Sequence, residues 1–307
     1  MSEAISVLGL TKKFGGVTAV DGLTFSVSPG ETVALLGPNG SGKTTTIRTL
    51  AGLLRPTGGR ALVMGEDIKA NPKRAAAKMA YLPQQALFPP QLTAREIILF
   101  HAALRKIPAE KALSALRNAG IEEKNEARPA GTFSGGMKQR LSLAIVLASC
   151  APVLLLDEPT ANLDPLAAIN FRQTAKKWRA EGKALLIATH VLSDVEELAD
   201  RVVIVVEGRA VAVITTQELR LKLQSFARLR VDAAAPSEDL IRRAITCGAT
   251  FAKKNGHAVI VTAPVEKRLA ILDGIASIGE IRHFETEEPS LEDLYIEYVK
   301  GAGDGIS

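Results

Sequence analysis

Gly37-Pro38-Asn39-Gly40-Ser41-Gly42-Lys43-Thr44 is the stretch that decides the fold, because it matches the pattern G-x-x-x-x-G-K-[ST] at every required position. The apolar run Thr32–Leu36 precedes it, and a helix-forming segment follows it from Thr45 to Leu50. Glycines here let the backbone point successive N–H groups at phosphate oxygens, and the following helix adds the positive end of its dipole. We expect the stretch and the adjacent Thr45 to bind nucleotide phosphates, with Lys43 neutralising their charge and Thr44 ligating Mg²⁺.

A second chemical signal ends another apolar run, Val153-Leu154-Leu155-Leu156-Asp157-Glu158. An acid at the carboxyl end of a buried strand beside a phosphate loop can hold the metal, directly or through water, and this role falls to Asp157. Glu158 stands one residue further, where its carboxylate can polarise an attacking water. Acids at strand ends are often merely solvated, but the phosphate loop favours the chemical interpretation.

The first two thirds of the chain alternate short apolar runs with helical stretches, which predicts an α/β domain. Three runs are continuous, as is typical of central parallel strands buried on both faces: Thr32–Leu36, Val153–Asp157 and Ala184–Thr189. Further strands are expected at Ile5–Leu10, Leu23–Val27, Val202–Val206 and Ala210–Ile214. Between about Leu87 and Ala148 the strand signal disappears and helical spacing takes over, which predicts a helical insertion.

After about Leu219 the pattern changes to the order β-α-β-β-α-β, which predicts a small α+β module of ferredoxin-like type. Its strands are expected at Phe226–Val231, Thr250–Lys254, His257–Thr262 and Glu280–Glu285, and its helices at Ser237–Thr246 and Val265–Ile278. We therefore predict a nucleotide-binding domain over residues 1–219, with a helical subdomain at about 87–148, and an accessory domain over residues 220–307.

Composition excludes several classes of protein. With 47% apolar and 23% charged residues, the chain can bury a core, which rules out wholesale disorder. Its two cysteines lie far apart, which argues against a disulfide-stapled secreted domain. The uncharged apolar stretch Leu141–Leu156 is short for a bilayer and contains Pro152, so we expect neither a membrane span nor a signal peptide. The net charge of +5 is scattered and aromatic residues make up only 4%, so no nucleic-acid partner is expected.

Ser134-Gly135-Gly136-Met137-Lys138-Gln139-Arg140 resembles the signature of the ATP-binding subunits of ABC transporters, with Phe133 where leucine is commoner. Read from the residues alone, a serine before two glycines and a helical run is an anion-binding helix N-terminus. The resemblance extends from Ile5 to about Leu219, and it implies a P-loop ABC ATPase core. In this family the signature closes over the γ-phosphate bound by a partner subunit. The resemblance therefore implies a homodimer that holds two ATP molecules, with Ser134, Gly135 and Gly136 contributing to nucleotide binding.

The same resemblance implies roles for further residues. Gln84, rather than Gln85, takes the position that senses Mg²⁺ and the attacking water. His190, at the end of a predicted strand, takes the position that contacts the γ-phosphate. Asp164, in the sequence Asn-Leu-Asp, falls in the loop that crosses the dimer interface. Phe14 lies where the family places an aromatic ring on the adenine, although a phenylalanine at a strand end is also often a core residue.

The segment Pro289–Tyr295 (PSLEDLY) resembles the ending of ATPases that pair with ABC-2-type membrane subunits. These ATPases resemble exporters of drugs, lipids or polysaccharides, and include subunits linked to copper or sulfur supply. Because Glu158, His190 and the signature are intact, we expect an active ATPase that powers transport through a separate membrane subunit by ATP-driven dimerisation. We expect it in the cytoplasm, peripheral on the inner face of the membrane. The alternatives are a soluble ABC ATPase acting on ribosomes or DNA, and a regulatory binder without turnover, which the intact Glu158 argues against.

Overall fold

A computed structural model describes residues 3–161, 163–234, 238–279 and 281–287. Its internal contacts divide the chain into two compact units, Met1–Val213 and Ile214–Ser307. The predicted domain boundary after Leu219 falls inside helix α9 (Thr216–Gln224), which begins with a capping box between Thr215 and Glu218. The limits 1–219 and 220–307 remain a prediction. In the described part of the chain, no helix combines the length and the apolar character needed to cross a bilayer.

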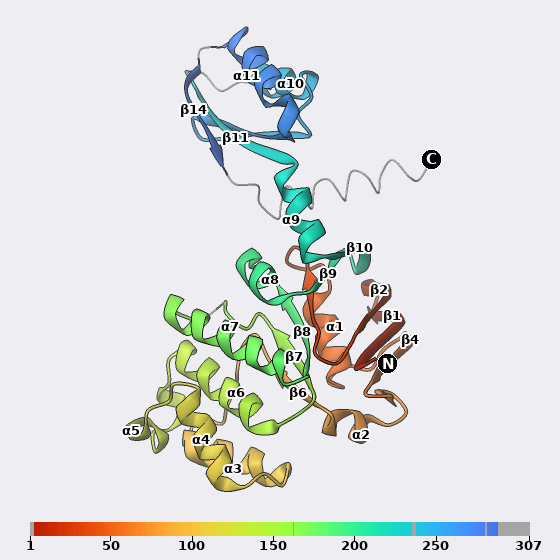
Figure 1. Ribbon diagram of the computed structural model, residues 1–307, viewed down its shortest axis with the longest axis vertical. Helices are drawn as coiled ribbons and strands as arrows, with labels where there is room; N and C mark the ends of the chain where they lie inside the picture. The colour runs from red at the N-terminus through yellow and green to blue at the C-terminus, as the bar shows by residue number, and fades with distance from the viewer. Residues whose placement is uncertain (1–2, 162, 235–237, 280, 288–307) are drawn as a thin grey trace. The chain divides into compact units, whose positions relative to one another are not determined.

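A six-stranded sheet with the order β10-β9-β3-β8-β7-β6 forms the centre of the larger unit (Figure 1). Its strands are β3 (Thr32–Leu36), β6 (Met79–Leu82), β7 (Val153–Asp157), β8 (Ala184–Thr189), β9 (Arg201–Val206) and β10 (Arg209–Thr215). Strands β3, β7 and β8 have the predicted bounds, are buried at every residue and pair in parallel. Because these strands run in one direction, their carboxyl ends reach the same edge of the sheet. The residues that follow them therefore meet there.

A second, four-stranded sheet has the order β2-β1-β4-β5. It contains β1 (Ile5–Phe14), β2 (Val17–Val27), β4 (Gly58–Val63) and β5 (Glu66–Asp67). Strands β4, β5 and β6 were absent from the sequence-based prediction. The first half of β4 is Gly58-Gly59-Arg60, a poor strand signal, and this strand forms because it pairs with β1 and buries Ala61 and Val63.

The predicted helical insertion is confirmed. Residues 87–148 contain α3 (Ala94–Leu104), α4 (Ala109–Asn118), α5 (Glu123–Glu126), the 3₁₀ turn η1 (Ala130–Thr132) and most of α6 (Gly135–Ser149). These helices lie together in Figure 1, and α3, α4 and α6 share one apolar cluster that includes Ile98, Leu116 and Leu141. The remaining helices of the larger unit are α1 (Lys43–Leu50), α2 (Pro72–Ala77), α7 (Pro165–Ala180) and α8 (Leu192–Leu198).

The smaller unit has the predicted ferredoxin-like topology. It runs β11 (Phe226–Ala233), α10 (Glu238–Thr246), β12 (Phe251–Asn255), β13 (Ala258–Pro264), η2 (Val265–Lys267), α11 (Arg268–Ala276) and β14 (Ile281–Glu287). The sheet order is β12-β13-β11-β14 with antiparallel pairs throughout, as two interleaved β-α-β units require. Ser237, the first residue of the helix predicted over Ser237–Thr246, and the Pro289–Tyr295 segment lie outside the described residues.

Candidate nucleotide-binding site

A pocket of about 340 Å³ opens where the carboxyl ends of β3 and β7 meet the start of α1. It brings together residues from four separate parts of the sequence. Its lining consists of Ala19, Asn39, Gly40, Gly42, Lys43, Thr44, Thr45, Gln84 and Glu158. The predicted phosphate loop, Gln84 and Glu158, the acid after β7, therefore share one cavity, which we call the phosphate-loop pocket.

The phosphate loop depends on its glycines for both conformation and space. Gly40 and Gly42 have φ angles of 83° and 102°, which residues with a side chain rarely adopt. A Cβ on Gly37 would lie 2.2 Å from the Val205 carbonyl oxygen, and one on Gly42 would lie 2.3 Å from the Ala19 carbonyl oxygen. Gly42 caps α1 without a side-chain hydrogen bond, so no side chain occupies the N-terminal N–H groups of this helix. The loop thus has the geometry of an anion cradle.

Lys43 places a buried ammonium group beside this cradle. Its Nζ donates to the carbonyl oxygens of Gly37 at 2.7 Å and Pro38 at 3.0 Å. Desolvation lowers the pKa of Lys43, while the nearby carboxylates of Glu158 and Asp157 act in the opposite direction. A buried cation at the mouth of a backbone cradle favours an anionic ligand.

Thr44 and Asp157 supply the oxygen atoms that Mg²⁺ prefers. The Thr44 hydroxyl donates to Asp157 Oδ1 at 2.8 Å, although the two residues are 113 positions apart in sequence. Burial raises the pKa of Asp157, and the Thr44 hydrogen bond and the charge of Arg48 partly offset this effect. A hydroxyl and one carboxylate suit Mg²⁺, which takes its other ligands from phosphates and water. These residues therefore fit the expected cofactor.

Glu158 and His190 form a direct pair at the same edge of the sheet. Glu158 Oε1 lies 2.8 Å from His190 Nδ1. The Glu158 side chain is only 5% exposed, and its second oxygen, Oε2, is buried with no hydrogen-bond partner among the described residues. A buried carboxylate oxygen without a partner is costly, so a ligand or water that donates to it would be stabilised there. The predicted base thus has one oxygen held by His190 and the other free to accept a proton.

The signature segment lines a different pocket of about 330 Å³, which we call the signature pocket. Its residues are Ser134, Gly136, Met137, Arg140, Leu163 and Asp164. Ser134 caps α6 and accepts from the Met137 N–H at 3.3 Å. Asp164 caps α7 by accepting from Ala167 N–H at 2.8 Å, and it forms an ion pair with Arg140 at 2.9 Å. The backbone hydrogen bond from Ala167 lowers the pKa of Asp164. The two pockets share no lining residue.

The structure does not bring every predicted residue to the first pocket. Phe14, at the end of β1, is 47% exposed and is not among the pocket-lining residues. The ammonium of Lys12 lies 4.7 Å from the centre of its ring. Sequence reasoning missed Ala19, which lines the pocket, and Tyr81, whose hydroxyl lies 3.5 Å from Asp157 Oδ2. Tyr81 lies on the unpredicted strand β6, and Ala19 carries no chemical signal in the sequence.

A phosphate loop between β3 and α1, with an acid pair after the neighbouring strand β7, defines the class of P-loop nucleotide-hydrolysing proteins. Within this class, the chain belongs to the family of ATP-binding subunits of ABC transporters. The family model described as ABC transporter matches residues 20–161, and the model described as ATP-binding protein DrrA1-3-like, C-terminal domain, matches residues 215–299.

Curated relatives and solved structures agree with this membership. The chain is 32% identical to the daunorubicin/doxorubicin resistance ATP-binding protein DrrA of Streptomyces peucetius, over 96% of this chain and 92% of the relative. It is 39% identical to the Nod factor export ATP-binding protein I of Burkholderia orbicola, over 68% of this chain and 69% of the relative. A dimeric bacterial ABC transporter cassette superimposes with a TM-score of 0.64 and 25% identity, covering 69% of this chain and 98% of that cassette.

The chain is therefore an ATP-binding and ATP-hydrolysing subunit of an ABC transporter, similar to the ATPases of exporters. The two curated relatives are named for drug resistance and for export, which favours transport over action on ribosomes or DNA. The predicted fold class, an ABC ATPase core with a helical subdomain and a small α+β unit, is confirmed.

Proposed function

We propose that this chain hydrolyses Mg²⁺-bound ATP with Glu158 as the general base, and that it acts as a homodimer that drives export through a separate membrane subunit. One observation carries the catalytic part of this proposal. Glu158 lines the same pocket as Lys43 and Thr44, with one carboxylate oxygen bonded to His190 and the other buried without a partner. This is the arrangement that proton abstraction from a bound water requires.

The residues that line the pocket, together with Phe14, Asp157 and His190, divide the work of phosphoryl transfer among them. Phe14 and the loop Gly37–Thr45 bind the nucleotide, and Lys43 neutralises phosphate charge. Mg²⁺, held by Thr44 and Asp157 with Gln84 beside it, would neutralise the charge that develops on the phosphates. Glu158 accepts a proton from the attacking water, and His190 orients the Glu158 carboxylate and contacts the γ-phosphate. Such positioning and charge stabilisation account for most of the catalysis of phosphoryl transfer.

The separation of the two pockets supports the homodimer. Ser134, Gly135 and Gly136 form the N-terminus of α6, and none of them lines the phosphate-loop pocket of their own chain. A second copy arranged head to tail would place this N-terminus over the γ-phosphate of the first, with Asp164 at the interface. The dimeric arrangement of the similar cassette supports this arrangement.

We assign the membrane partner to an integral subunit of ABC-2 type, and the chain to the cytoplasmic face of the membrane. The similarity of residues 215–299 to the C-terminal domain of DrrA-like proteins supports this choice. The segment from Gln84 to Arg105 also exposes large apolar side chains, among them Leu87 at 89%. Exposed apolar groups on a helical subdomain suit contact with a membrane protein. The large apolar residues exposed in this segment are Leu87, Leu92, Phe100 and Leu104.

The variant Glu158→Gln tests the catalytic assignment. It removes the base but keeps the size of the side chain, so we expect ATP binding to persist while turnover falls by roughly 100- to 10,000-fold. The bound ATP should then trap a dimer, measurable by size-exclusion chromatography with light scattering. Glu181→Gln is the matched control, because Glu181 is an exposed acid outside the pocket. Wild-type turnover in Glu158→Gln would refute the role of Glu158.

The membrane partner is tested by isolating the tagged full-length chain from gently solubilised membranes, with and without ATP. An integral membrane protein of ABC-2 type is expected to copurify. Copurification of ribosomes or DNA, with no membrane protein, would overturn the transport assignment while leaving the ATPase intact.

A further inference from the structure

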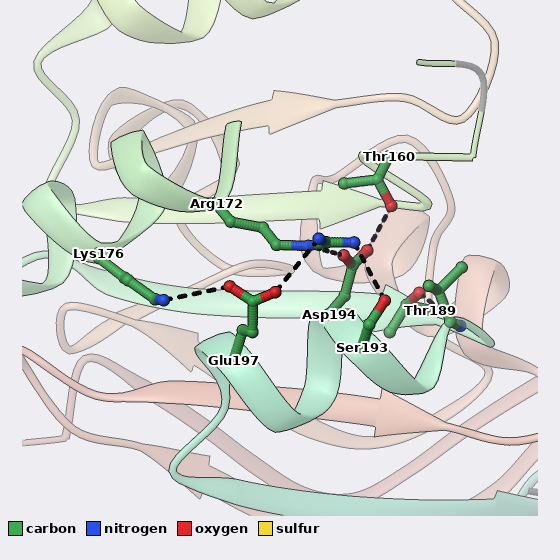
Figure 2. Close-up of polar contacts among 8 residues, drawn as sticks. Thr160, Arg172, Lys176, Thr189, Ser193, Asp194 and Glu197 are labelled. Atoms are coloured by element: carbon green, nitrogen blue, oxygen red, sulfur yellow. Dashed lines mark hydrogen bonds and ion pairs between the residues drawn. The ribbon is translucent and has the colours of Figure 1, made fainter. Parts of the chain in front are cut away.

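A fully buried carboxylate that does not line the nucleotide pocket has no part in the roles described so far. Asp194 belongs to the first turn of α8, and its side chain is 0% exposed. A buried charge must be paired and hydrogen-bonded, because burial removes its hydration. Two other segments of the chain supply the partners. Thr160 Oγ1 donates to Asp194 Oδ2, and Arg172 Nε donates to Asp194 Oδ1 at 2.8 Å (Figure 2).

Arg172 fastens α7 to α8 through several hydrogen bonds. Besides Asp194, its guanidinium donates to Ser193 Oγ at 3.0 Å and to Glu197 Oε1 at 3.2 Å. The Arg172 side chain is largely buried, whereas Glu197 lies at the exposed edge of the network and also accepts from Lys176 at 3.2 Å. Figure 2 shows the guanidinium lying between Asp194, Ser193 and Glu197. One side chain of α7 thus determines the orientation of the buried carboxylate on α8.

This network joins the two segments that carry the proposed catalytic pair. Thr160 follows Glu158 by two residues, and Asp194 follows His190 by four residues. Besides the pairing of β7 with β8, side-chain contacts join the two segments at Glu158 and His190 and at Thr160 and Asp194. Thr189 adds a local restraint, because its buried hydroxyl accepts from the Val191 N–H at 3.0 Å.

We propose that Asp194 is a positioning residue for ATP hydrolysis. By accepting from Thr160, it keeps the Glu158 segment in register with the His190 segment, and Arg172 holds Asp194 in place for this task. The inference rests on the proposed roles of Glu158 and His190. Neither Thr160, Arg172 nor Asp194 lines the phosphate-loop pocket, so the network acts on the orientation of the base and not on nucleotide binding.

The paired variants Thr160→Val and Thr160→Ser test the link directly. Valine has nearly the shape of threonine but cannot donate to Asp194, whereas serine keeps the hydroxyl. Because catalysis is sensitive to small displacements of reacting groups, we expect Thr160→Val to lower kcat roughly 10- to 100-fold. KM for ATP and the Kd of a fluorescent ATP analogue should remain unchanged, and Thr160→Ser should retain most of the wild-type kcat.

Control variants separate positioning from general stability. Glu196→Gln removes a charge from an exposed residue of the same helix α8 that takes part in none of these contacts, so kcat should stay at the wild-type value. Arg172→Lys keeps the positive charge but cannot donate to Asp194, Ser193 and Glu197 together, and it should lower kcat at unchanged KM. This variant carries the test if Thr160→Val does not fold, and a wild-type kcat in it would then overturn the proposal.

The outcomes distinguish this inference from the proposed function. Wild-type kcat in Thr160→Val, or equal losses in the valine and serine variants, would overturn the positioning role of Asp194. Glu158→Gln is measured in the same assay. If Glu158→Gln is inactive while Thr160→Val is normal, only the positioning role fails. If Glu158→Gln itself turns over at the wild-type rate, the proposed catalytic role of Glu158 fails.

Discussion

The two pockets of the larger unit differ in how their polar groups are satisfied. The phosphate-loop pocket contains buried charges, and in the part of the chain that the structure describes Glu158 Oε2 and Ser41 Oγ, in and beside this pocket, lack hydrogen-bond partners. In the signature pocket, Asp164 and Ser134 are instead occupied as helix caps, and Arg140 pairs with Asp164. The phosphate-loop pocket thus has polar atoms without hydrogen-bond partners in the described structure, and a nucleotide and water can supply those partners. In the signature pocket, the side chains of Ser134, Arg140 and Asp164 already have hydrogen-bond or ion-pair partners, so its contribution depends on what a second copy brings to it.

Gly135→Asp tests whether the signature pocket depends on a second copy of the chain. A Cβ on Gly135 meets no atom within 4 Å, and an acid in the first turn of a helix is favourable, so the fold should be retained. In the proposed dimer, the carboxylate of the new aspartate would face the γ-phosphate of the ATP bound by the second copy and would repel it. We expect steady-state ATP hydrolysis to fall about 100-fold or more. ATP should also no longer trap a dimer in the Glu158→Gln background, measured by light scattering.

Gly135→Asn is the matched control, because it adds similar bulk without charge. It should lose much less activity than Gly135→Asp. Normal dimer formation by Gly135→Asp would show that the signature pocket does not face phosphate, and would remove the distinction between the two pockets.

Asp157→Asn tests whether the buried charge of Asp157, beside the phosphate-loop pocket, lowers the free energy of unfolding. Burial raises the pKa of Asp157, so the folded protein favours the protonated acid. The stability contribution of Asp157 therefore falls as pH rises from its ordinary pKa through the raised folded-state pKa. A neutral asparagine avoids this loss. We expect the nucleotide-free variant to melt a few degrees above wild type at about pH 7, with the difference shrinking towards about pH 4.

The same variant should lose Mg²⁺-dependent hydrolysis, and removal of Mg²⁺ with EDTA should abolish turnover by the wild-type protein. Melting temperatures across pH, read by differential scanning fluorimetry, provide the measurement. A lower melting temperature for Asp157→Asn at about pH 7 would mean that the bonds from Thr44 and Tyr81 outweigh desolvation.

Phe14→Ala tests whether the exposed ring of Phe14, which does not line the phosphate-loop pocket, contributes to ATP affinity; its expected effect is the smallest of those considered. If the ring stacks on adenine, its loss should weaken ATP binding about 2- to 10-fold, the range of aromatic contacts worth about 0.5–1.5 kcal/mol. Phe14→Tyr should bind like wild type. Isothermal titration calorimetry gives the affinities, and an unchanged Kd for Phe14→Ala would leave this half-exposed ring as a surface residue.

Some elements could be predicted to the residue from sequence. Strands β3, β7 and β8 are apolar throughout because both faces are buried, so their bounds are visible in the sequence. Strand β4 could not be found in this way, because Gly58, Gly59 and Arg60 have poor strand preferences and the strand forms only through pairing with β1. The six-residue helix α2 and the two-residue strand β5 carry too little periodicity to be recognised.

The sequence by itself determined the local chemistry of this protein: the glycine loop, the acid pair after β7, the serine cap of α6 and the β-α-β-β-α-β order of the smaller unit. These features are local, because backbone conformation and helix capping depend on neighbouring residues. Only the tertiary structure decided which side chains meet. Thr44 reaches Asp157, Glu158 reaches His190, and Thr160 reaches Asp194 across gaps of 113, 32 and 34 residues. Those contacts follow from the parallel order β3-β8-β7, which aligns the ends of distant strands at one edge.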